Sequence, residues 1–297
     1  MSSQIEKGPI LVVAQDAGGA EILVSYVRSD ASGRRFDIYA AGAASKIFRR
    51  EGMNARSITS ADLKRVISLY RGGTALLGTG HPTESLELAA LQEAKRQGLR
   101  TISWLDSWKR FRERYGYPAK GWKNNLPDQI MAGDPVAYAL AVRYFPAVKV
   151  RRAQNPYFNH IRSSVRSLRQ KPDAVLFLSA AGDLSYKLLK ALLDGLSGRD
   201  RSPRIIVRLH PLDDAQVIAS LLRASLADAV LSDAEDLARD LAQAKVAVGG
   251  ETTALAAAAY AGIPTICLWR VSIPLPFKKM RRVSSESAAV RAVLEVA

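Results

Sequence analysis

The segment 245–268, KVAVGGETTALAAAAYAGIPTICL, restricts the fold more than any other part of the chain. The apolar run at 246–248 predicts a buried strand, and two glycines then form a turn. An alanine-rich helix follows, and 265–268 predicts a second buried strand. Alanine side chains have little bulk, so this helix can lie close to a sheet. The segment therefore predicts a strand–helix–strand unit of a parallel sheet.

The start of this helix has the composition of a phosphate-binding loop. Gly249 and Gly250 let the backbone turn tightly and approach a ligand, and Thr252 or Thr253 can cap the helix. The N–H groups of the first turn, beside Glu251, then form an anion site at the carboxyl edge of the sheet. An ordinary structural turn explains the same residues, so the segment alone leaves both interpretations open.

A second motif lies upstream, in the segment 203–211, PRIIVRLHP. Its β-branched residues predict a short strand that ends in Arg208 and His210. A helix, a short strand and another helix are predicted between 215 and 244. Parallel strands end at the same edge of their sheet, so we expect His210 to face the start of the alanine-rich helix.

Taken in order over roughly residues 173–268, these motifs resemble the donor half of GT-B-fold glycosyltransferases. The resemblance is closest to the group with a His-Pro motif, the bacterial sialyl- and polysialyltransferases and the CDP-glycerol glycerophosphotransferases. A looser similarity extends to the UDP-N-acetylglucosamine 2-epimerases. In the His-Pro group the histidine and small hydroxyl residues at the later helix start contact the donor phosphates. The resemblance assigns these roles to His210 and to Thr252 and Thr253, with Ser179 and Gly182 in the first loop of the same domain as further candidates.

The chain length and charge agree with such an enzyme but do not single it out. The 297 residues, 48% of them hydrophobic, are enough for two domains with separate cores. Lys and Arg number 43 and Asp and Glu 28, which gives a net charge of +15. A partner is therefore expected to be acidic: nucleotide phosphates, an anionic lipid surface, an acidic glycan or nucleic acid.

Localisation is expected to be cytoplasmic. The single cysteine, Cys267, lies in a predicted buried strand and cannot form a disulfide within the chain, which fits a reducing compartment. No apolar run has the length of a signal peptide or a membrane span. Apolar and basic residues alternate in 270–282, which could contact an anionic membrane surface at its inner face; the alternative is a loop before a closing helix at 287–296.

The amino-terminal half offers a candidate catalytic base. A predicted strand at 10–14 is followed by a glycine-containing loop with Asp16. In GT-B proteins this first loop faces the cleft, so the resemblance suggests that Asp16 takes the acceptor proton while Gly18 and Gly19 leave room for a sugar. The alternative is that Asp16 caps the helix or orders the loop. Asp106, at the end of a predicted strand at 100–105, is the second candidate base.

Two further loops are candidates for acceptor contacts. Gly-Thr-Gly at 78–80 precedes His81 and Glu84, for which a phosphate or acceptor contact competes with an ordinary loop and helix-start role. The run 108–123 interleaves six basic residues with five aromatic ones, a composition that can stack on sugar rings or bases and hold phosphates. We interpret this run as an acceptor clamp; a structural loop or a nucleic-acid surface is the alternative. Its candidate contacts are Trp108, Arg112 and Tyr115.

The predicted architecture is α/β, with two doubly wound Rossmann-like domains facing a cleft, as in GT-B enzymes. We expect an acceptor-side domain at 1–155, a crossover at 156–172 and a donor-binding domain at 173–297. Three histidines and one cysteine show no metal-ligand spacing, and GT-B enzymes usually need no metal, so no cofactor is expected. The Glu-x7-Glu pattern of many retaining enzymes is absent, because Ala259 stands eight residues after Glu251.

The sequence thus predicts an inverting glycosyltransferase that moves a sugar or sugar-like group from an activated nucleotide donor to a glycan or lipid-linked acceptor, in surface polysaccharide synthesis. Arg208, His210 and the 250–253 helix start would bind the donor phosphates. Two alternatives remain: a nucleotide-sugar 2-epimerase or hydrolase, which needs no acceptor, and a non-catalytic basic module that binds anionic glycan or nucleic acid.

Overall fold

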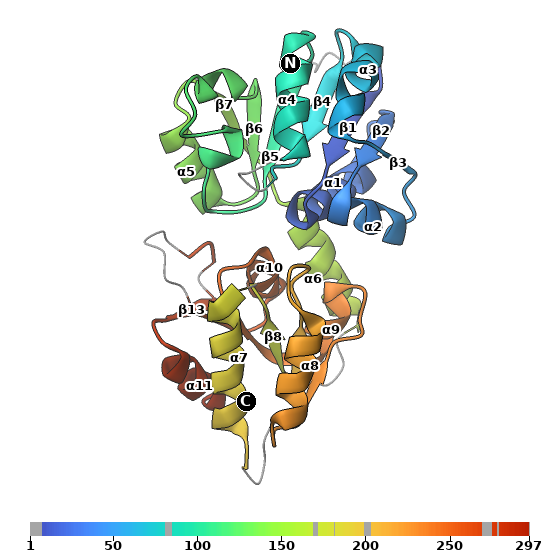
Figure 1. The fold of residues 1–297 in the computed structure, drawn as a ribbon. Helices are drawn as coiled ribbons and strands as arrows, with labels where there is room; N and C mark the ends of the chain where they lie inside the picture. Colours follow the sequence, from blue (N-terminus) through green and yellow to red (C-terminus); the bar gives the residue numbers. More distant parts are fainter. Residues whose placement is uncertain are drawn as a thin grey trace. The chain divides into compact units, whose positions relative to one another are not determined.

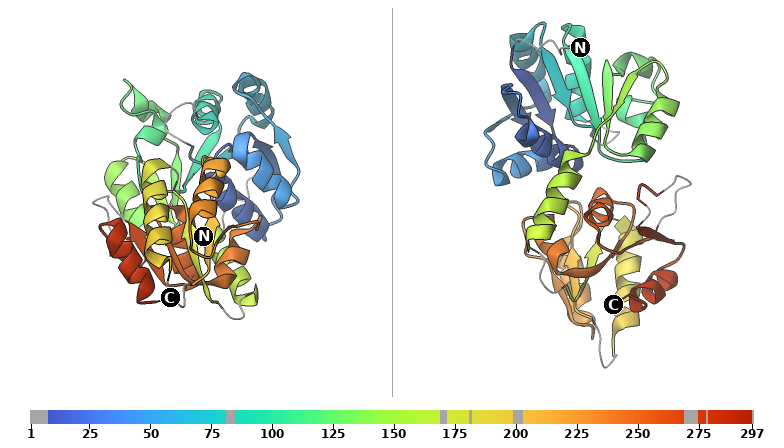
Figure 2. Two further views of the ribbon diagram at one scale, coloured as in Figure 1. Left: turned by 60° about the horizontal axis from the view of Figure 1, so that its bottom comes forward. Right: turned by 180° about the vertical axis from the view of Figure 1, so that it is seen from behind.

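The chain forms two compact α/β units, Met1–Tyr157 and Phe158–Ala297, called the N-unit and the C-unit below (Figures 1 and 2). The computed structural model describes residues 8–80, 85–168, 172–180, 182–198, 203–268, 275–277 and 279–296. Each unit has its own parallel sheet and its own hydrophobic core, so each is described by itself.

The N-unit is built on a seven-stranded parallel sheet with the order β3-β2-β1-β4-β5-β6-β7. Its central strands are buried on both faces, since Leu11 and Val13 join one core cluster while Val12 and Ala14 join another. This explains why the sequence of β1 is continuously apolar rather than alternating. The strands are β1 Ile10–Ala14, β2 Phe36–Ala40, β3 Ala55–Ser57, β4 Thr74–Leu77, β5 Arg100–Leu105, β6 Gln129–Ala132 and β7 Lys149–Arg152.

Helices cover both faces of this sheet. Residues of α1 and α2, among them Leu23 and Phe48, pack on one face, whereas α3, α4 and α5 pack on the other through residues such as Ile67, Leu91 and Ala141. The helices are α1 Ala17–Ser29, α2 Gly42–Arg50, η1 Ser60–Asp62, α3 Leu63–Ile67, η2 Ser68–Tyr70, α4 Leu86–Arg96, η3 Glu113–Tyr115, η4 Trp122–Asn125 and α5 Pro135–Tyr144.

The C-unit repeats the plan with a six-stranded parallel sheet in the order β10-β9-β8-β11-β12-β13. Leucines of α7 form the largest share of the core on one face, with Ile218 of α8 and Ala289 of α11. The strands are β8 Ala174–Leu178, β9 Ile205–Arg208, β10 Ala229–Leu231, β11 Ala244–Gly249, β12 Thr265–Leu268 and β13 Met280–Val283. The helices are α6 Pro156–Leu168, α7 Gly182–Leu196, α8 Ala215–Ala224, α9 Leu237–Gln243, α10 Thr253–Ala261 and α11 Glu286–Leu294.

In both sheets the order in which successive strands are added reverses at the first strand of the sheet. β1 lies between β2 and β4, and β8 lies between β9 and β11, so the helices on the two sides of that strand lie on opposite faces. In open α/β sheets ligands bind at the carboxyl ends of the strands at this switch point. The loops after β1 and β4, and after β8 and β11, are therefore the places to examine for a site.

The doubly wound α/β architecture confirms the prediction from sequence, but several elements were not predicted. The short strand β3 and the edge strand β13 are half polar, so they lack a strong apolar pattern. The basic stretch after residue 161, expected to be part of a crossover, continues α6 as far as Leu168. The basic 270–282 segment contains β13, although residues 270–274 and 278 lie outside the described part. Among the described helices, none combines the length and the apolar character that crossing a membrane requires.

Candidate functional site

The carboxyl edge of the C-unit sheet brings the two sequence motifs together. Leu178 of β8 is in register with Arg208 of β9 on one side and with Gly249 of β11 on the other. The loops that follow these strands therefore begin at the same level, and they carry Ser179, His210 and Gly250. The predicted neighbourhood of the His-Pro motif and the glycine turn follows from this register.

Close packing between β8 and β11 explains the two glycines of the turn. A Cβ on Gly249 would lie 2.3 Å from the carbonyl oxygen of Leu178, and a Cβ on Gly250 would lie 3.0 Å from the Cβ of Ala180. Both glycines are buried. The two glycines thus make room for the neighbouring strand and loop, and their close approach to a ligand stays a prediction.

The helix start after the turn is well ordered by its cap. The Oγ1 of Thr252 accepts a hydrogen bond of 3.0 Å from the backbone N–H of Leu255, so Thr252 is the N-cap of α10. Thr253 is the first residue of the helix, and Glu251 lies half-buried before the cap. The N–H groups of such a first turn point out of the helix end, where its dipole favours an anion.

His210 is held in one tautomer by its own loop. Its backbone N–H donates to Asp213 Oδ2 at 2.7 Å, and its ring Nδ1 accepts from the backbone N–H of Leu212 at 3.2 Å. A neutral imidazole that accepts at Nδ1 carries its proton on Nε2. His210 is half-buried, so its Nε2–H is a hydrogen-bond donor at the edge of the sheet.

Arg208 has a structural role that sequence reasoning missed. Its Nη1 forms an ion pair of 2.7 Å with Asp240, whose side chain is 2% exposed, and also donates to the carbonyl oxygen of Ala234. Its Nη2 donates to the carbonyl oxygen of Glu235. The guanidinium therefore anchors the segment before α9, and a direct contact of Arg208 with a phosphate stays a prediction.

The remaining candidates of the C-unit lie in the loop after β8. Ser179 is 9% exposed, and its backbone N–H donates to the carbonyl oxygen of Arg208 at 3.1 Å. The Oγ of Ser185 accepts from the N–H of Ala180 at 2.7 Å and so closes the loop. Gly182 begins α7 with a φ of +76°, a conformation that favours glycine. These residues shape the loop.

In the N-unit, a buried carboxylate that sequence reasoning missed orders the loop after β1. Glu87 Oε1 accepts from the backbone N–H groups of Gln15 at 2.6 Å and Asp16 at 3.1 Å. Its Oε2 accepts from the hydroxyl of Ser85, the N-cap of α4, at 2.8 Å. Burial raises the pKa of the Glu87 carboxyl, and the hydrogen bonds from the two backbone amides oppose this shift.

Glu87 thus fixes the position of Asp16, the first candidate base. Asp16 precedes α1, but its side chain makes no capping hydrogen bond to that helix. Asp16 is thus the N-cap residue of α1 by position, without a side-chain capping bond, and its role as a base stays a prediction. In the sequence, Glu87 is one of several acids in the first turns of helices, and only its contact with a loop more than 70 residues away distinguishes it.

Asp106, the second candidate base, is already engaged in a network. Its Oδ1 accepts from Thr79 Oγ1 at 2.9 Å and forms an ion pair of 2.8 Å with Arg114. A Cβ added to Gly18 would lie only 2.4 Å from Asp106 Oδ2, so a glycine is needed at this position for the carboxylate to approach the start of α1. Gly19 packs against Gly78: a Cβ added to Gly19 would lie only 3.2 Å from the Cα of Gly78.

The aromatic residues of the 108–123 run form part of the core. Trp108 is 6% exposed, and its indole Nε1–H donates to Asp134 Oδ2 at 2.9 Å. Tyr115 is 1% exposed and packs edge-on against Phe145. The prediction that Trp108 and Tyr115 stack on an acceptor is not supported by this burial. Arg112 is exposed and lies over the ring of Tyr144 at 5.0 Å.

Two predicted acceptor-side residues, His81 and Glu84, lie outside the described residues. Within the described ranges, no group of three or more His, Cys, Asp and Glu side chains lies together as metal ligands would. The ordered candidates are therefore divided between two edges: His210 and Thr252 in the C-unit, and Asp16 with its supporting Glu87 in the N-unit.

Comparison with solved structures identifies the fold. The chain is similar to MnaA of S. aureus in complex with UDP, with a TM-score of 0.72 and 11% identity over 97% of this chain and 87% of that one. The UDP-GlcNAc 2-epimerase from Neisseria meningitidis bound to UDP-GlcNAc has a TM-score of 0.66 and 13% identity, over 97% and 90%. The E. coli heptosyltransferase WaaC with ADP-2-deoxy-2-fluoro heptose has a TM-score of 0.54 and 15% identity, over 97% and 100%.

This chain has the GT-B fold. No protein-family model matches its sequence, and the comparison with curated proteins finds no match. At 11–15% identity the three likenesses show the GT-B fold alone, and the His-Pro group of sialyltransferases is not among these structures. The structures that share the GT-B fold with this chain are those of enzymes acting on nucleotide sugars.

Proposed function

We propose that this chain is an inverting, metal-independent glycosyltransferase, which moves a sugar or sugar-like group from a nucleotide-activated donor to a glycan or lipid-linked acceptor in surface polysaccharide synthesis. The observation that supports it most is the carboxyl edge of the C-unit sheet. There the proton-bearing Nε2 of His210 follows β9 and the capped start of α10 follows β11, the two strands that flank β8.

The donor diphosphate is the group that this edge suits. The Nε2–H of His210 would donate to a phosphate oxygen, and the first-turn N–H groups of α10 would donate to another. The helix dipole adds about 0.3–1 kcal/mol of favourable interaction with an anion. These donors would also stabilise the negative charge that develops on the leaving nucleotide. Arg208 would support them by holding the segment before α9.

Asp16 is the base in this proposal. Transfer forms a bond between the acceptor oxygen and the sugar carbon while the bond from that carbon to the donor phosphate oxygen breaks. The acceptor proton passes to the Asp16 carboxylate, and the nucleotide leaves with the bonding electron pair. Glu87, which fixes the Asp16 backbone, would position the base. Asp106, whose Oδ1 binds Thr79 and Arg114, is the second candidate base.

A thermal-shift panel tests the donor site. A nucleotide that binds only the folded protein raises its midpoint of unfolding. We expect one of UDP, CDP, GDP, CMP and CMP-sialic acid to raise the midpoint of the wild type, and this shift to disappear in His210→Ala. His160→Ala is the matched control, because His160 is an exposed histidine on α6 of the same unit. If no nucleotide shifts the wild type, the transferase proposal fails and a basic binding module for anionic glycan or nucleic acid takes precedence.

A second candidate function is a nucleotide-sugar 2-epimerase or hydrolase. It is favoured by the higher TM-score of the epimerase structure, 0.66 against 0.54 for the heptosyltransferase. Neither reaction needs an acceptor. Nuclear magnetic resonance can follow consumption of the donor that the panel identifies, first without any acceptor. Epimerised or hydrolysed sugar would indicate the second candidate function, whereas turnover only with added acceptor supports the transferase.

A further inference from the structure

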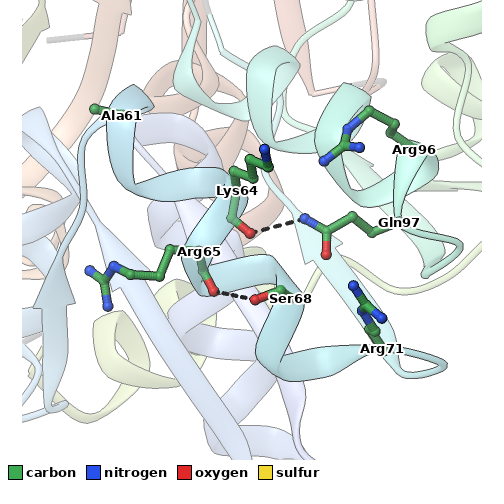
Figure 3. Close-up of a pocket in the computed structure, with 7 residues that line it drawn as sticks. All are labelled: Ala61, Lys64, Arg65, Ser68, Arg71, Arg96 and Gln97. Atoms are coloured by element: carbon green, nitrogen blue, oxygen red, sulfur yellow. Dashed lines mark hydrogen bonds between the residues drawn. The ribbon is translucent and has the colours of Figure 1, made fainter.

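A cationic hollow of about 650 Å³ opens on the N-unit, between the end of α3 with η2 and the end of α4 (Figure 3). Four of its seven lining residues carry a positive charge, so its electrostatic potential is positive. The lining residues are Ala61, Lys64, Arg65, Ser68, Arg71, Arg96 and Gln97. We call it the cationic pocket.

Two of the four cations have no ion-pair partner within the described part of the protein. Arg65 pairs with Asp62 at 3.2 Å, and Arg96 pairs with Glu93 at 2.5 Å. Lys64 and Arg71 form no ion pair with any described residue. The cationic pocket therefore has an excess of about two positive charges, which matches in magnitude the negative charge of a phosphate monoester near neutral pH.

The geometry of the cationic pocket is set by hydrogen bonds between its walls. Gln97 Nε2 donates to the carbonyl oxygen of Lys64 at 3.0 Å and to Glu93 Oε1 at 2.5 Å, which ties the end of α4 to α3. Ser68 Oγ donates to the carbonyl oxygen of Arg65 at 2.7 Å. In Figure 3 the side chains of Lys64, Arg71 and Arg96 lie on the α4 side of the hollow, whereas Arg65 points to the other side.

Helix-end stabilisation accounts for only part of this arrangement. Cations in the last turn interact favourably with the helix dipole, which explains Lys64 and Arg65 in α3 and Arg96 in α4. Arg71 follows η2 in the connection to β4, so it belongs to no last turn. Its exposed guanidinium adds charge at the same hollow without a partner of its own among the described residues.

The cationic pocket is at the opposite edge of the N-unit sheet from the proposed base. η2 leads into the start of β4, and α4 leads into the start of β5, so the pocket lies at the amino edge. Asp16 and Asp106 follow the carboxyl ends of β1 and β5. A ligand of this pocket is therefore distinct from the group that reacts at the carboxyl edge.

We propose that the cationic pocket binds a phosphate group, through Lys64, Arg71 and Arg96, and that this site works independently of the proposed donor site. The phosphate belongs to a lipid headgroup or to a soluble phosphorylated molecule. Leu69 of η2 is 68% exposed, and an exposed leucine beside cations suits a bilayer surface.

Vesicle binding tests the lipid source. The variant is Lys64→Gln/Arg71→Gln, and the matched control is Lys149→Gln/Arg151→Gln, which removes two exposed cations from the edge strand β7 of the same unit. Sedimentation with phosphatidylcholine vesicles, with and without phosphatidylglycerol, measures affinity. We expect the anionic vesicles to bind the wild type and the control with the same affinity. The pocket variant should bind about 25-fold more weakly, because each of the two lost cations contributes about fivefold in affinity near the surface.

Calorimetry with glycerol 3-phosphate and inorganic phosphate tests the soluble source with the same proteins. Binding that only the pocket variant loses supports the site with a soluble ligand, even if no vesicle binds. All four side chains are exposed, so unchanged midpoints of unfolding will show that both variants fold. Equal weakening in the two double variants would mean that net charge alone attracts anions, and absence of binding to vesicles and phosphates alike would equally overturn the proposal.

Discussion

Replacing Arg208 by methionine should destabilise the C-unit severely, because it leaves a buried carboxylate without its cation. Asp240 is 2% exposed at its side chain and accepts from Arg208 Nη1 at 2.7 Å. The hydroxyl of Ser232 also donates to Asp240 and lies 2.7 Å from both carboxylate oxygens. A hydroxyl stabilises a buried charge far less than a guanidinium does.

The magnitude follows from the burial of the two partners. Removing one partner of a buried ion pair costs about 3–5 kcal/mol. The Arg208 side chain is 23% exposed, so water reaches part of the pair and we expect the lower end, about 3 kcal/mol. With a denaturant dependence of about 2–3 kcal/mol per molar urea, the midpoint of unfolding should fall by about 1 M.

Urea unfolding followed by far-ultraviolet circular dichroism measures this loss. Arg281→Met is the matched control, since Arg281 pairs with Glu295 on the surface of the same unit and its loss should change little. Adding Asp240→Asn to Arg208→Met removes the unpaired charge and should recover most of the stability. If Arg208→Met unfolds at the same urea concentration as Arg281→Met, the reasoning about the buried charge is refuted.

Three further predictions concern the loops at the two carboxyl edges. Burial raises the pKa of Glu87 above its ordinary value of 4.5, so the stability that the protonated carboxyl contributes is lost as pH rises through the folded-state pKa. In urea unfolding at several pH values, the free energy of unfolding of the wild type should therefore fall relative to that of Glu87→Gln as pH rises above 4.5. A difference that does not change with pH would contradict this. Gly249→Ala should cost about 3 kcal/mol, since the new Cβ meets a backbone oxygen, whereas Gly250→Ala should cost about 1 kcal/mol; equal urea midpoints would argue against the packing explanation. Thr252→Ala should lose about 1 kcal/mol in the same assay and Thr252→Ser should lose little, because serine restores the N-cap of α10; similar losses in both variants would show that the cap is not the cause.

The fold was predictable because its signal is local. The apolar runs of β1, β4 and β8 are long enough to identify strands buried on both faces, and the helices between them follow from the regular alternation. β3 and β13 escaped prediction because a short strand at the border of a sheet is only half-buried. Their pairing partners, not their own residues, make them strands.

The candidate site was predictable in position but not in detail. Strand order places the loops of His210 and of the α10 start at the same edge, on the two sides of β8, and the shared edge follows from sequence once the sheet is assumed to be parallel. Glu87 was missed because its partners, Gln15 and Asp16, are more than 70 residues away. The cationic pocket was likewise hidden, since η2 and the end of α4 meet only after the sheet forms.

The sequence by itself determined the central strands, their parallel arrangement and the edge of the sheet at which the loops gather. Hydrophobic periodicity and turn residues carry this information within a few neighbouring positions of the chain. Only the tertiary structure decided which polar and aromatic side chains are still exposed for a ligand. Trp108 is paired with Asp134, 26 positions along the chain, and Arg208 with Asp240, 32 positions along. Burial and pairing depend on neighbours that folding brings together, so composition alone does not show which side chains are buried or paired.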